Sequence, residues 1–290
     1  MTNPINHRLD SAPDIHFNAW GDLLTDLAPM RAHDKPRPYG LTMALDRCQG
    51  LTELADLLTM VGHYVDHLKL SFGTSALLSA GFVQRKTALL RAHQIDVYPG
   101  GTLAEIMLAQ HVFPEYVQRA KALGFTAVEI SDGTLELPPA VRHEAIQRAL
   151  EVGLKVITEV GKKDSRVEVP IATMCEQIVA DLQAGASLVI IEARESGTNI
   201  GIYDGSGAIR AERLAEMEAQ LRGYEDRIMW EAPLPRQQTA LITHFGPNVN
   251  LGNIRPTDVL GLEALRRGLR FDTLHHLAPD LHIDGDGSGD

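Results

Sequence analysis

The chain has 290 residues, of which 44% are hydrophobic and 22% charged, as expected for a soluble globular protein. Its formal net charge of -11 argues against nucleic acid or an anionic membrane as a general partner. Two cysteines, Cys48 and Cys175, exclude a disulfide framework and a CxxC metal pair. The amino terminus carries no apolar leader, and no apolar run is long enough to span a membrane, so we expect a cytoplasmic protein.

Three segments are predicted along the chain. Residues 1–35 contain several prolines and little periodicity, which favours an N-terminal extension. Residues 36–278 are predicted to form one folded domain, and residues 279–290 a polar, flexible tail. The tail contains Asp284-Gly-Asp-Gly, which resembles the start of a calcium-binding loop, but the downstream glutamate ligand is missing. A solvated tail is therefore favoured over a calcium site.

Strand-like and helix-like runs alternate through the central domain. Strands are predicted at residues 40–46, 67–72, 95–98, 127–131, 155–160, 188–193, 227–232 and 248–252. Helical patterns lie between them, for example at residues 75–93, 114–123, 139–152, 170–184, 209–222 and 235–245. Eight such alternations predict an α/β protein with the (β/α)8 TIM-barrel fold. An open doubly wound sheet is the alternative, but no GxGxxG follows the first strand.

Four apolar runs carry a glutamate at the same internal position, namely Glu129, Glu159, Glu192 and Glu231. A carboxylate inside a buried strand is costly unless a cation or hydrogen-bond donors compensate it. Four of them in step along the chain indicate that their side chains converge on one polar centre.

The alternation of side chains along each strand places these glutamates on the inner face of the barrel. Each strand has one apolar face and one face that becomes polar toward its carboxyl end, where active sites of this fold lie. The predicted inward polar ring consists of Asp46, Lys69, Ser71, Asp96, Glu129, Ser131, Glu159, Glu192, Arg194, Glu231 and Asn250.

Several clustered carboxylates predict a divalent, oxygen-binding metal such as magnesium, because no histidine-rich constellation accompanies them. The alternative is a structural ion network in which Lys69 and Arg194 neutralise the glutamates. Glycine turns after the second, fifth and eighth predicted strands would suit an anionic small molecule. Cys48 has no histidine placed to activate it, so we do not expect it to be a nucleophile.

The strand ends and loops resemble the phosphosulfolactate synthase family over residues 35–273. The resemblance rests on Lys35-Pro-Arg, Gly40-Leu-Thr-Met, Lys69-Leu-Ser-Phe-Gly-Thr-Ser-Ala, Asp96-Val-Tyr-Pro-Gly-Gly-Thr, Glu129-Ile-Ser-Asp-Gly-Thr, Glu159-Val-Gly-Lys-Lys-Asp, Ile191-Glu-Ala-Arg-Glu-Ser-Gly and Phe245-Gly-Pro-Asn-Val-Asn-Leu-Gly-Asn-Ile. It implies a (β/α)8 barrel that adds sulfite to phosphoenolpyruvate with Mg²⁺, giving (2R)-phospho-3-sulfolactate, the first step toward coenzyme M in some organisms. The family also includes plant heat-stress-associated relatives.

The resemblance implies roles for most residues of the ring and for three residues of the loops. Lys162 is expected to be the general acid, with Lys69 as the alternative. Glu129, Glu159 and Glu192 are the expected magnesium ligands, with Asp46 as a weaker candidate. The remaining candidates would bind or orient substrate: Arg194, Ser131, Glu231, Asn250, Gly252 and Asn253.

Three other interpretations remain open at the level of sequence. Glu129 and Glu231 occupy the strands that carry the two carboxylates of retaining glycoside hydrolases on this fold, although aromatics are only 5% of the chain. A non-catalytic barrel is a second possibility. The third is a family member that uses a different nucleophile, suggested by Ser71 where the family pattern leads us to expect glycine. A homo-oligomer is possible by analogy with other barrels.

Overall fold

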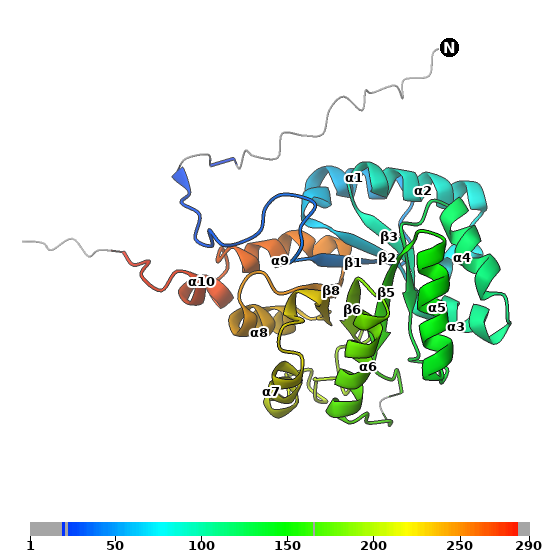
Figure 1. Cartoon of the computed structure of the whole chain (residues 1–290). Coiled ribbons are helices and arrows are strands. Elements are labelled where there is room, and N and C mark those ends of the chain that lie inside the picture. Colours follow the sequence, from blue (N-terminus) through cyan, green and yellow to red (C-terminus); the bar gives the residue numbers. More distant parts are fainter. Residues whose placement is uncertain (1–18, 21–22, 165, 284–290) are drawn as a thin grey trace, which may run out of the picture.

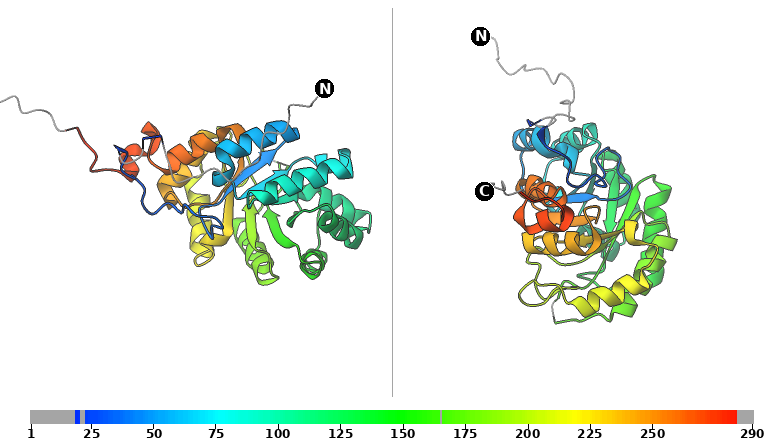
Figure 2. Two further views of the ribbon diagram at one scale, coloured as in Figure 1. Left: turned by 90° about the horizontal axis from the view of Figure 1, so that it is seen from above. Right: turned by 90° about the vertical axis from the view of Figure 1, so that its left-hand side faces the viewer.

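The computed structural model describes residues 19–20, 23–164 and 166–283. Parallel strands form one eight-stranded sheet in the order β3-β2-β1-β8-β7-β6-β5-β4, and helices cover its outer face (Figures 1 and 2). The strands are β1 Thr42–Asp46, β2 His67–Leu70, β3 Asp96–Pro99, β4 Ala127–Ile130, β5 Lys155–Val160, β6 Leu188–Ile191, β7 Ile228–Glu231 and β8 Leu251–Ile254. The predicted (β/α)8 barrel is confirmed.

One seam of the barrel, between β3 and β4, is not closed by a strand ladder. Thr126, just before β4, bridges the seam instead. Its backbone N–H donates to the Val97 carbonyl (3.0 Å), and its Oγ1 accepts from the Val97 N–H (2.9 Å). A threonine hydroxyl therefore supplies one of the backbone partners that a ladder would provide.

The helices follow the strands in chain order, and short 3-10 turns occur in several connections. The α-helices are α1 Leu51–Val61, α2 Ala80–Ala92, α3 Gly101–Ala109, α4 Phe113–Ala122, α5 Pro139–Glu151, α6 Ile171–Gln183, α7 Ala211–Gln220, α8 Pro235–Phe245, α9 Val259–Arg266 and α10 Phe271–Leu277. Helix α2 begins five residues later than predicted, because Ser79 caps it by accepting from the Phe82 N–H. The preceding turn, Thr74–Leu77, is a 3-10 helix.

Two apolar layers result from the alternation of side chains along the strands. The outer layer fills the space between strands and helices. The inner layer is a plug inside the barrel, formed by Leu41, Met43, Tyr98, Ala127, Ile157, Leu188, Ile190 and Met229. The plug closes the barrel interior, so polar side chains at the carboxyl ends of the strands form the floor of any pocket at that end.

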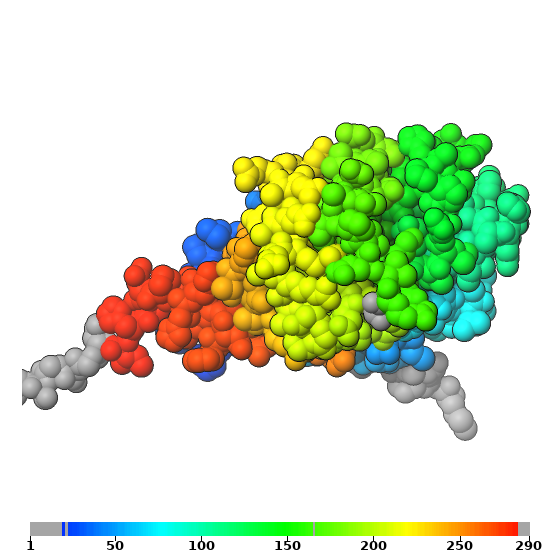
Figure 3. All heavy atoms as spheres, turned by 90° about the horizontal axis from the view of Figure 1, so that it is seen from below, coloured from blue at the N-terminus to red at the C-terminus, as the bar shows by residue number. Residues whose placement is uncertain are grey.

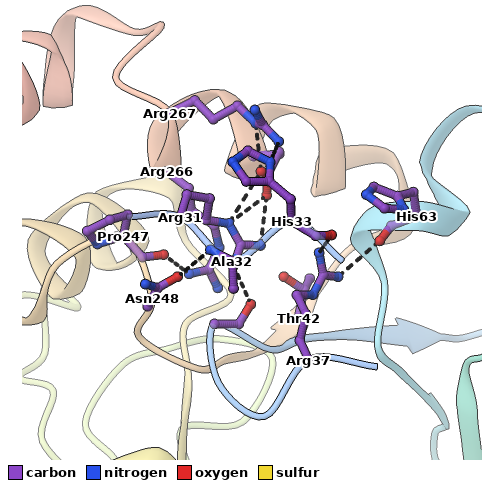
Figure 4. A network of polar contacts seen from close by, with 12 residues as sticks. Arg31, Ala32, His33, Arg37, Thr42, His63, Pro247, Asn248, Arg266 and Arg267 are labelled. Atoms are coloured by element: carbon purple, nitrogen blue, oxygen red, sulfur yellow. Dashed lines mark hydrogen bonds and ion pairs between the residues drawn. The ribbon is translucent and has the colours of Figure 1, made fainter. Parts of the chain in front are cut away.

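The amino-terminal end of the barrel is closed by buried arginines (Figure 4). Arg31 donates to Glu263 of α9 (3.0–3.3 Å) and to the Gly40 carbonyl (2.9 Å). Arg37 binds Asp66, just before β2, through two hydrogen bonds of 3.0 Å. Part of the segment predicted as an extension thus packs onto the folded body, and Figure 1 shows it beside α9 and α10.

A third arginine, Arg266 of α9, is fully buried in the same network. Its guanidinium donates to the carbonyls of Pro247, Val249 and Leu41, which precede β8 and β1. The arginine thereby adds a buried donor to three backbone carbonyls at this end of the barrel, one of which, that of Leu41, also accepts from the Leu251 N–H of β8 (2.9 Å).

The described residues contain no helix that is both long and apolar enough to cross a membrane. In the space-filling view of Figure 3, the green and yellow parts of the chain form a continuous face, and the red part, which includes α10, lies at one side. The Asp284-Gly-Asp-Gly segment, weighed above as a calcium loop, lies outside the described residues.

Removing the carboxylate of Glu263 should destabilise the fold. Burial raises the pKa of Glu263, but Arg31 outweighs burial and holds the pKa at about 2. Glu263→Gln leaves a buried guanidinium unpaired, so we expect a loss of about 3 to 5 kcal/mol in the free energy of unfolding at pH 7, measured by urea denaturation. Because the folded pKa is depressed, the wild-type advantage should disappear as the pH falls from the unfolded pKa, about 4.5, toward 2.

The matched control is Glu144→Gln, which removes an exposed partner of Arg148 on α5. An exposed ion pair is worth at most about 1 kcal/mol. Equal effects of the two substitutions would contradict a stabilising role for the Arg31–Glu263 contact.

Candidate active site

A cavity of about 210 Å³ opens at the carboxyl ends of the strands, above the apolar plug. Its charged lining consists of Lys69, Lys163, Arg194, Glu129, Glu159, Glu192, Glu195 and Glu231. The four glutamates that are in step in the sequence are all buried and all reach this cavity. The predicted convergence of their side chains is therefore what the structure shows.

Lys69 of β2 lies at the centre of the buried charges. Its Nζ is 2.9 Å from Glu129 Oε2, 2.9 Å from Glu159 Oε2 and 3.5 Å from Glu231 Oε1. Burial by itself lowers the pKa of Lys69, but the three carboxylates outweigh burial and hold that pKa well above its usual value. Lys69 is thus a permanently charged counter-ion, which is the arrangement that the ion-network interpretation predicts for this residue.

Both carboxylate oxygens of Glu129, on β4, have partners in the protein. While Oε2 contacts Lys69, Oε1 accepts a hydrogen bond from the Gly101 N–H (2.6 Å) at the start of α3. A carboxylate is stabilised there by the helix dipole and by an otherwise unpaired N–H group. Burial nevertheless raises the pKa of Glu129 to about 7, against the opposing effect of Lys69. Glu129 therefore fixes α3 against the sheet.

Three other glutamates are arranged as a possible metal site. One carboxylate oxygen from each of Glu159, Glu192 and Glu231 lies within 4.8 Å of the others, and all three residues are buried. Glu159 Oε1 and Glu192 Oε2 accept no hydrogen bond from the described residues. Burial, together with Glu159 and Glu231, raises the pKa of Glu192 well above its usual value. A divalent cation would relieve this repulsion, so the acidic trio can bind a metal.

Lys163 supplies a second cation to the trio. Its Nζ is 3.2 Å from Glu159 Oε1 and 3.8 Å from Glu192 Oε2, and it donates to Thr102 Oγ1 (3.1 Å). Burial lowers the pKa of Lys163, but the neighbouring carboxylates reverse this effect and raise it. Lys163 is therefore protonated at neutral pH and lines the cavity.

Lys162 points away from the cavity. Its Nζ donates to the carbonyl oxygen and to the carboxylate of Asp132, both at 2.7 Å, and it lines a separate depression between the loops after β5 and β6. The expectation that Lys162 reaches the barrel mouth is wrong. Both lysines follow the same glycine, and the turn after β5 decides which side chain faces inward.

Arg194 lies at the rim of the cavity, three residues after the end of β6. Its guanidinium donates to the Lys163 carbonyl (3.2 Å), and it forms no ion pair with any carboxylate in the described parts of the chain. Its backbone is left-handed, with φ of 60°, as are those of Phe72 and Asn253, which also line the cavity. Such conformations are strained for residues other than glycine and are frequent at ligand sites.

A family model described as "(2R)-phospho-3-sulfolactate synthase (ComA)" matches residues 30–272. The chain belongs to this family. It is 44% identical over 251 residues to the phosphosulfolactate synthase of Methanothermobacter thermautotrophicus, covering 86% of this chain and 96% of the relative. It is 35% identical to that of Bacillus subtilis, covering 84% and 96%, and 27% identical to the Arabidopsis thaliana protein HEAT-STRESS-ASSOCIATED 32, covering 80% and 87%. The suspected family membership is thereby confirmed, and it indicates an enzyme of the lyase type.

A solved structure supports the fold independently. A dihydrodipicolinate synthase from Agrobacterium tumefaciens superposes with a TM-score of 0.52 at 11% identity, covering 84% of this chain and 78% of that one. At that level of identity the likeness concerns the barrel alone.

The first strand of this synthase-family chain faces the opposite way from the prediction. Leu41 and Met43 belong to the inner plug, and Leu45 lines the cavity, so Asp46 faces the helices. There its carboxylate forms a buried ion pair with Lys86 of α2. Asp46 is therefore not part of the inward ring. Polar and apolar side chains do alternate along β1 as predicted. The polar face points outward, however, and Lys86 of α2 neutralises the Asp46 carboxylate there.

Two other predicted ring residues lie at the amino-terminal end of the barrel. Asp96, at the start of β3, pairs with Lys155 at the start of β5 (2.6 Å). The amide of Asn250, just before β8, accepts from the Leu41 N–H (2.9 Å) and donates to the carbonyls of Asp226 and Ile228. Asn250 is thus a structural residue, and the expectation that it contacts substrate is wrong.

Strand β8 extends two residues beyond the prediction, which changes the positions of its polar residues. Gly252 faces the plug, because an added Cβ would lie 2.9 Å from Met43 Cε and 3.2 Å from Met229 Sδ. It therefore does not reach the cavity as expected of a substrate contact. Asn253 does line the cavity, where Nδ2 donates to the Arg194 carbonyl (3.2 Å).

The two serines of the ring donate their hydroxyl protons to other parts of the protein. Ser71 lines the cavity and donates to the Asp46 carbonyl (2.6 Å). Ser131 donates to Glu105 of α3 (2.6 Å). Sequence reasoning missed Glu105, which lies on a helix and not at a strand end, and Lys163. The pair Lys162-Lys163 could have drawn attention to both lysines equally.

A methyl group at Gly101 should disrupt this site. An added Cβ would lie 2.5 Å from Ser131 Oγ and 2.9 Å from Glu129 Oε1. Gly101→Ala therefore forces Glu129 or α3 to move, and overpacking of this kind costs about 1 to 3 kcal/mol. Urea denaturation should show that loss. Gly261→Ala on α9, where an added Cβ meets open space, should be neutral or slightly stabilising. Equal stability of the two variants would contradict the close contact at Gly101.

Proposed function

We propose that the protein catalyses addition of sulfite to phosphoenolpyruvate, giving (2R)-phospho-3-sulfolactate. Family membership supports this reaction, and the observation that carries it is the position of Lys163. Its ammonium lies inside the cavity, beside a buried acidic trio and below Arg194 at the rim. A proton donor, a metal site and an anion-binding cation thus share one cavity of small-molecule size.

We further propose that Mg²⁺ binds the acidic trio Glu159, Glu192 and Glu231. The cavity lining contains three cations and five carboxylates, and one of these, Glu195, pairs with Arg47 outside the lining. An anionic substrate would therefore meet excess negative charge without a bound cation. Glu159 Oε1 and Glu192 Oε2, which accept no hydrogen bond from the described residues, suit magnesium. Glu231, whose Oε2 accepts from the Ala193 N–H (2.9 Å), takes the place expected for Glu129 because its carboxylate lies within 4.8 Å of the other two. Bound there, Mg²⁺ would stabilise negative charge that develops on the substrate carboxylate.

The chemical step requires one nucleophile and one proton. The sulfur lone pair of sulfite forms a bond to the methylene carbon of phosphoenolpyruvate, and the π electrons of the double bond move toward the carboxylate. Lys163 then donates a proton from Nζ to C2, while the phosphate ester stays intact. The carboxylates that raise the pKa of Lys163 keep it in the acid form that this step consumes.

We assign recognition of the anionic groups of the substrates to Arg194 at the rim of the cavity. Arg194 offers a planar fork of donors that matches phosphate or sulfite, and no carboxylate of the described residues competes for it. Asn253 Oδ1 is buried without a hydrogen-bond partner among those residues. A buried acceptor suits a donating ligand, so we assign phosphate recognition to Arg194 and not to Asn253.

The glycosidase alternative has little support in the geometry. Glu129 and Glu231 both contact Lys69, and Glu129 also binds the start of α3, so neither is available as a free nucleophile. Among the described residues that line the cavity, Phe72 is the one aromatic side chain, whereas sugar sites present aromatic platforms.

Substitution of the two adjacent lysines should separate their roles. Lys163→Ala should lower kcat for phosphoenolpyruvate and sulfite by about 100-fold or more, as expected for loss of a general acid. Lys162→Ala should lower it a few-fold at most, because a half-exposed ion pair is worth about 1 kcal/mol or less. Turnover is followed by loss of the enol-phosphate absorbance. Consumption of phosphoenolpyruvate with another nucleophile, but not with sulfite, would retain the enzyme and replace the named reaction.

Metal binding can be measured without turnover. Calorimetric titration with Mn²⁺ should show one site on the wild-type protein, competed by Mg²⁺. Glu192→Gln and Glu231→Gln should each weaken binding by about 10-fold or more, because each removes an anionic ligand. Glu129→Gln should leave the affinity nearly unchanged, because Glu129 does not belong to the trio whose carboxylate oxygens lie within 4.8 Å of one another. The reverse order of effects would restore Glu129 to the metal site.

A further inference from the structure

Glu105 of α3 is a buried carboxylate that takes no direct part in the proposed reaction. It is 3% exposed and does not line the cavity. No cationic side chain in the described ranges forms an ion pair with it. Instead, three donors from one loop compensate it: the Ser131 hydroxyl (2.6 Å), the Thr134 N–H (3.1 Å) and the Leu135 N–H (2.6 Å). A carboxylate satisfied in this way holds the backbone of residues 131–135 in one conformation.

Lys163 packs against the same loop. The Lys163 N–H donates to the Gly133 carbonyl (3.0 Å). A Cβ added to Gly133 would lie only 3.1–3.2 Å from the Cγ, Cδ and Cε atoms of Lys163, so the bare glycine makes room for the lysine stem. Helix α3 also contacts the head group, because Lys163 Nζ donates to Thr102 Oγ1 (3.1 Å). Backbone, stem and ammonium of Lys163 are thus all supported by α3 and by the loop that α3 holds.

We infer that Glu105 is a positioning residue for Lys163: through residues 131–135 it sets where the ammonium lies relative to the acidic trio. The inference rests on the proposed function of Lys163 as proton donor. Because proton transfer depends steeply on distance, a loop shift of about 1 Å costs on the order of 100-fold in rate without weakening substrate binding to the same degree.

The kinetic test uses the full chain and a double-mutant cycle. Glu105→Gln replaces the acceptor of the loop N–H groups at nearly constant volume, so it should lower kcat by about 10- to 100-fold, with KM for phosphoenolpyruvate changed less than about threefold. In the Lys163→Ala background the same substitution should change the residual kcat by less than about threefold. An equal reduction in both backgrounds, or a normal kcat for Glu105→Gln, would overturn the inference.

Gly133→Ala is a second variant that tests the same contact from the other side. The backbone of Gly133 is not left-handed, so alanine introduces only a methyl group pressed against the Lys163 stem. It should lower kcat in the wild-type background and leave the Lys163→Ala background unchanged. If Glu105→Gln does not fold, this variant still tests the loop through which Glu105 acts, and a normal kcat for Gly133→Ala would overturn the inference. Glu263→Gln is the matched control: a buried carboxylate at the opposite end of the barrel should affect stability but not kcat.

Hydrogen exchange separates failure of the inference from failure of the proposed function. Glu105→Gln should raise the exchange rates of the amides of Lys163 and Leu135 by 10-fold or more, as loss of fixed acceptors predicts. Unchanged protection of Lys163 would overturn the inference whatever the activity. Full activity of Lys163→Ala with the expected exchange result would instead overturn the assigned proton donor and leave the positioning contact in place.

Discussion

The contact on which the site depends is that between the Lys69 ammonium and three buried glutamates. Each of Glu129, Glu159 and Glu231 would be costly to bury as an isolated charge. The Lys69 ammonium compensates all three carboxylates, so its removal would leave three buried charges without their common counter-ion. The ion-network and catalytic interpretations are therefore not exclusive. Lys69 belongs to a structural network that keeps the remaining carboxylate oxygens available above it.

The contact with Lys69 gives the four strand glutamates different roles. Glu129 fixes the start of α3, whereas Glu159, Glu192 and Glu231 are left as a group with excess negative charge. Lys163 neutralises part of that negative charge, and a divalent cation would neutralise the rest. The two ends of the barrel thus differ in kind. At the amino-terminal end Arg31 and Arg37 pair with Glu263 and Asp66, while the opposite end holds carboxylate oxygens that accept no hydrogen bond from the described residues.

Much of the site could be predicted because a barrel strand alternates strictly between inside and outside. The predicted inward direction is correct for Lys69 and for the four glutamates, since each lies within a well-defined strand or, for Glu192, one residue after it. It is wrong for Asp46 because the inner face of β1 is apolar and Lys86 from α2 compensates the acid. It is wrong for Asn250 because β8 begins later than the apolar pattern indicated, which puts that amide below the plug.

The sequence by itself determined the fold, the family and the four strand glutamates at the barrel mouth, because strand periodicity and long loop motifs are local properties of the chain. Only the tertiary structure decided between Lys162 and Lys163, which are adjacent in sequence and chemically identical. A tight turn carries no periodicity that assigns faces, so the choice depends on Gly133 and Thr102, which lie 30 and 61 residues away from Lys163 and meet it only in the folded barrel. The role of Glu105 could not be predicted for the same reason. Its hydrogen-bond partners lie in residues 131–135, which contact α3 only in the folded barrel.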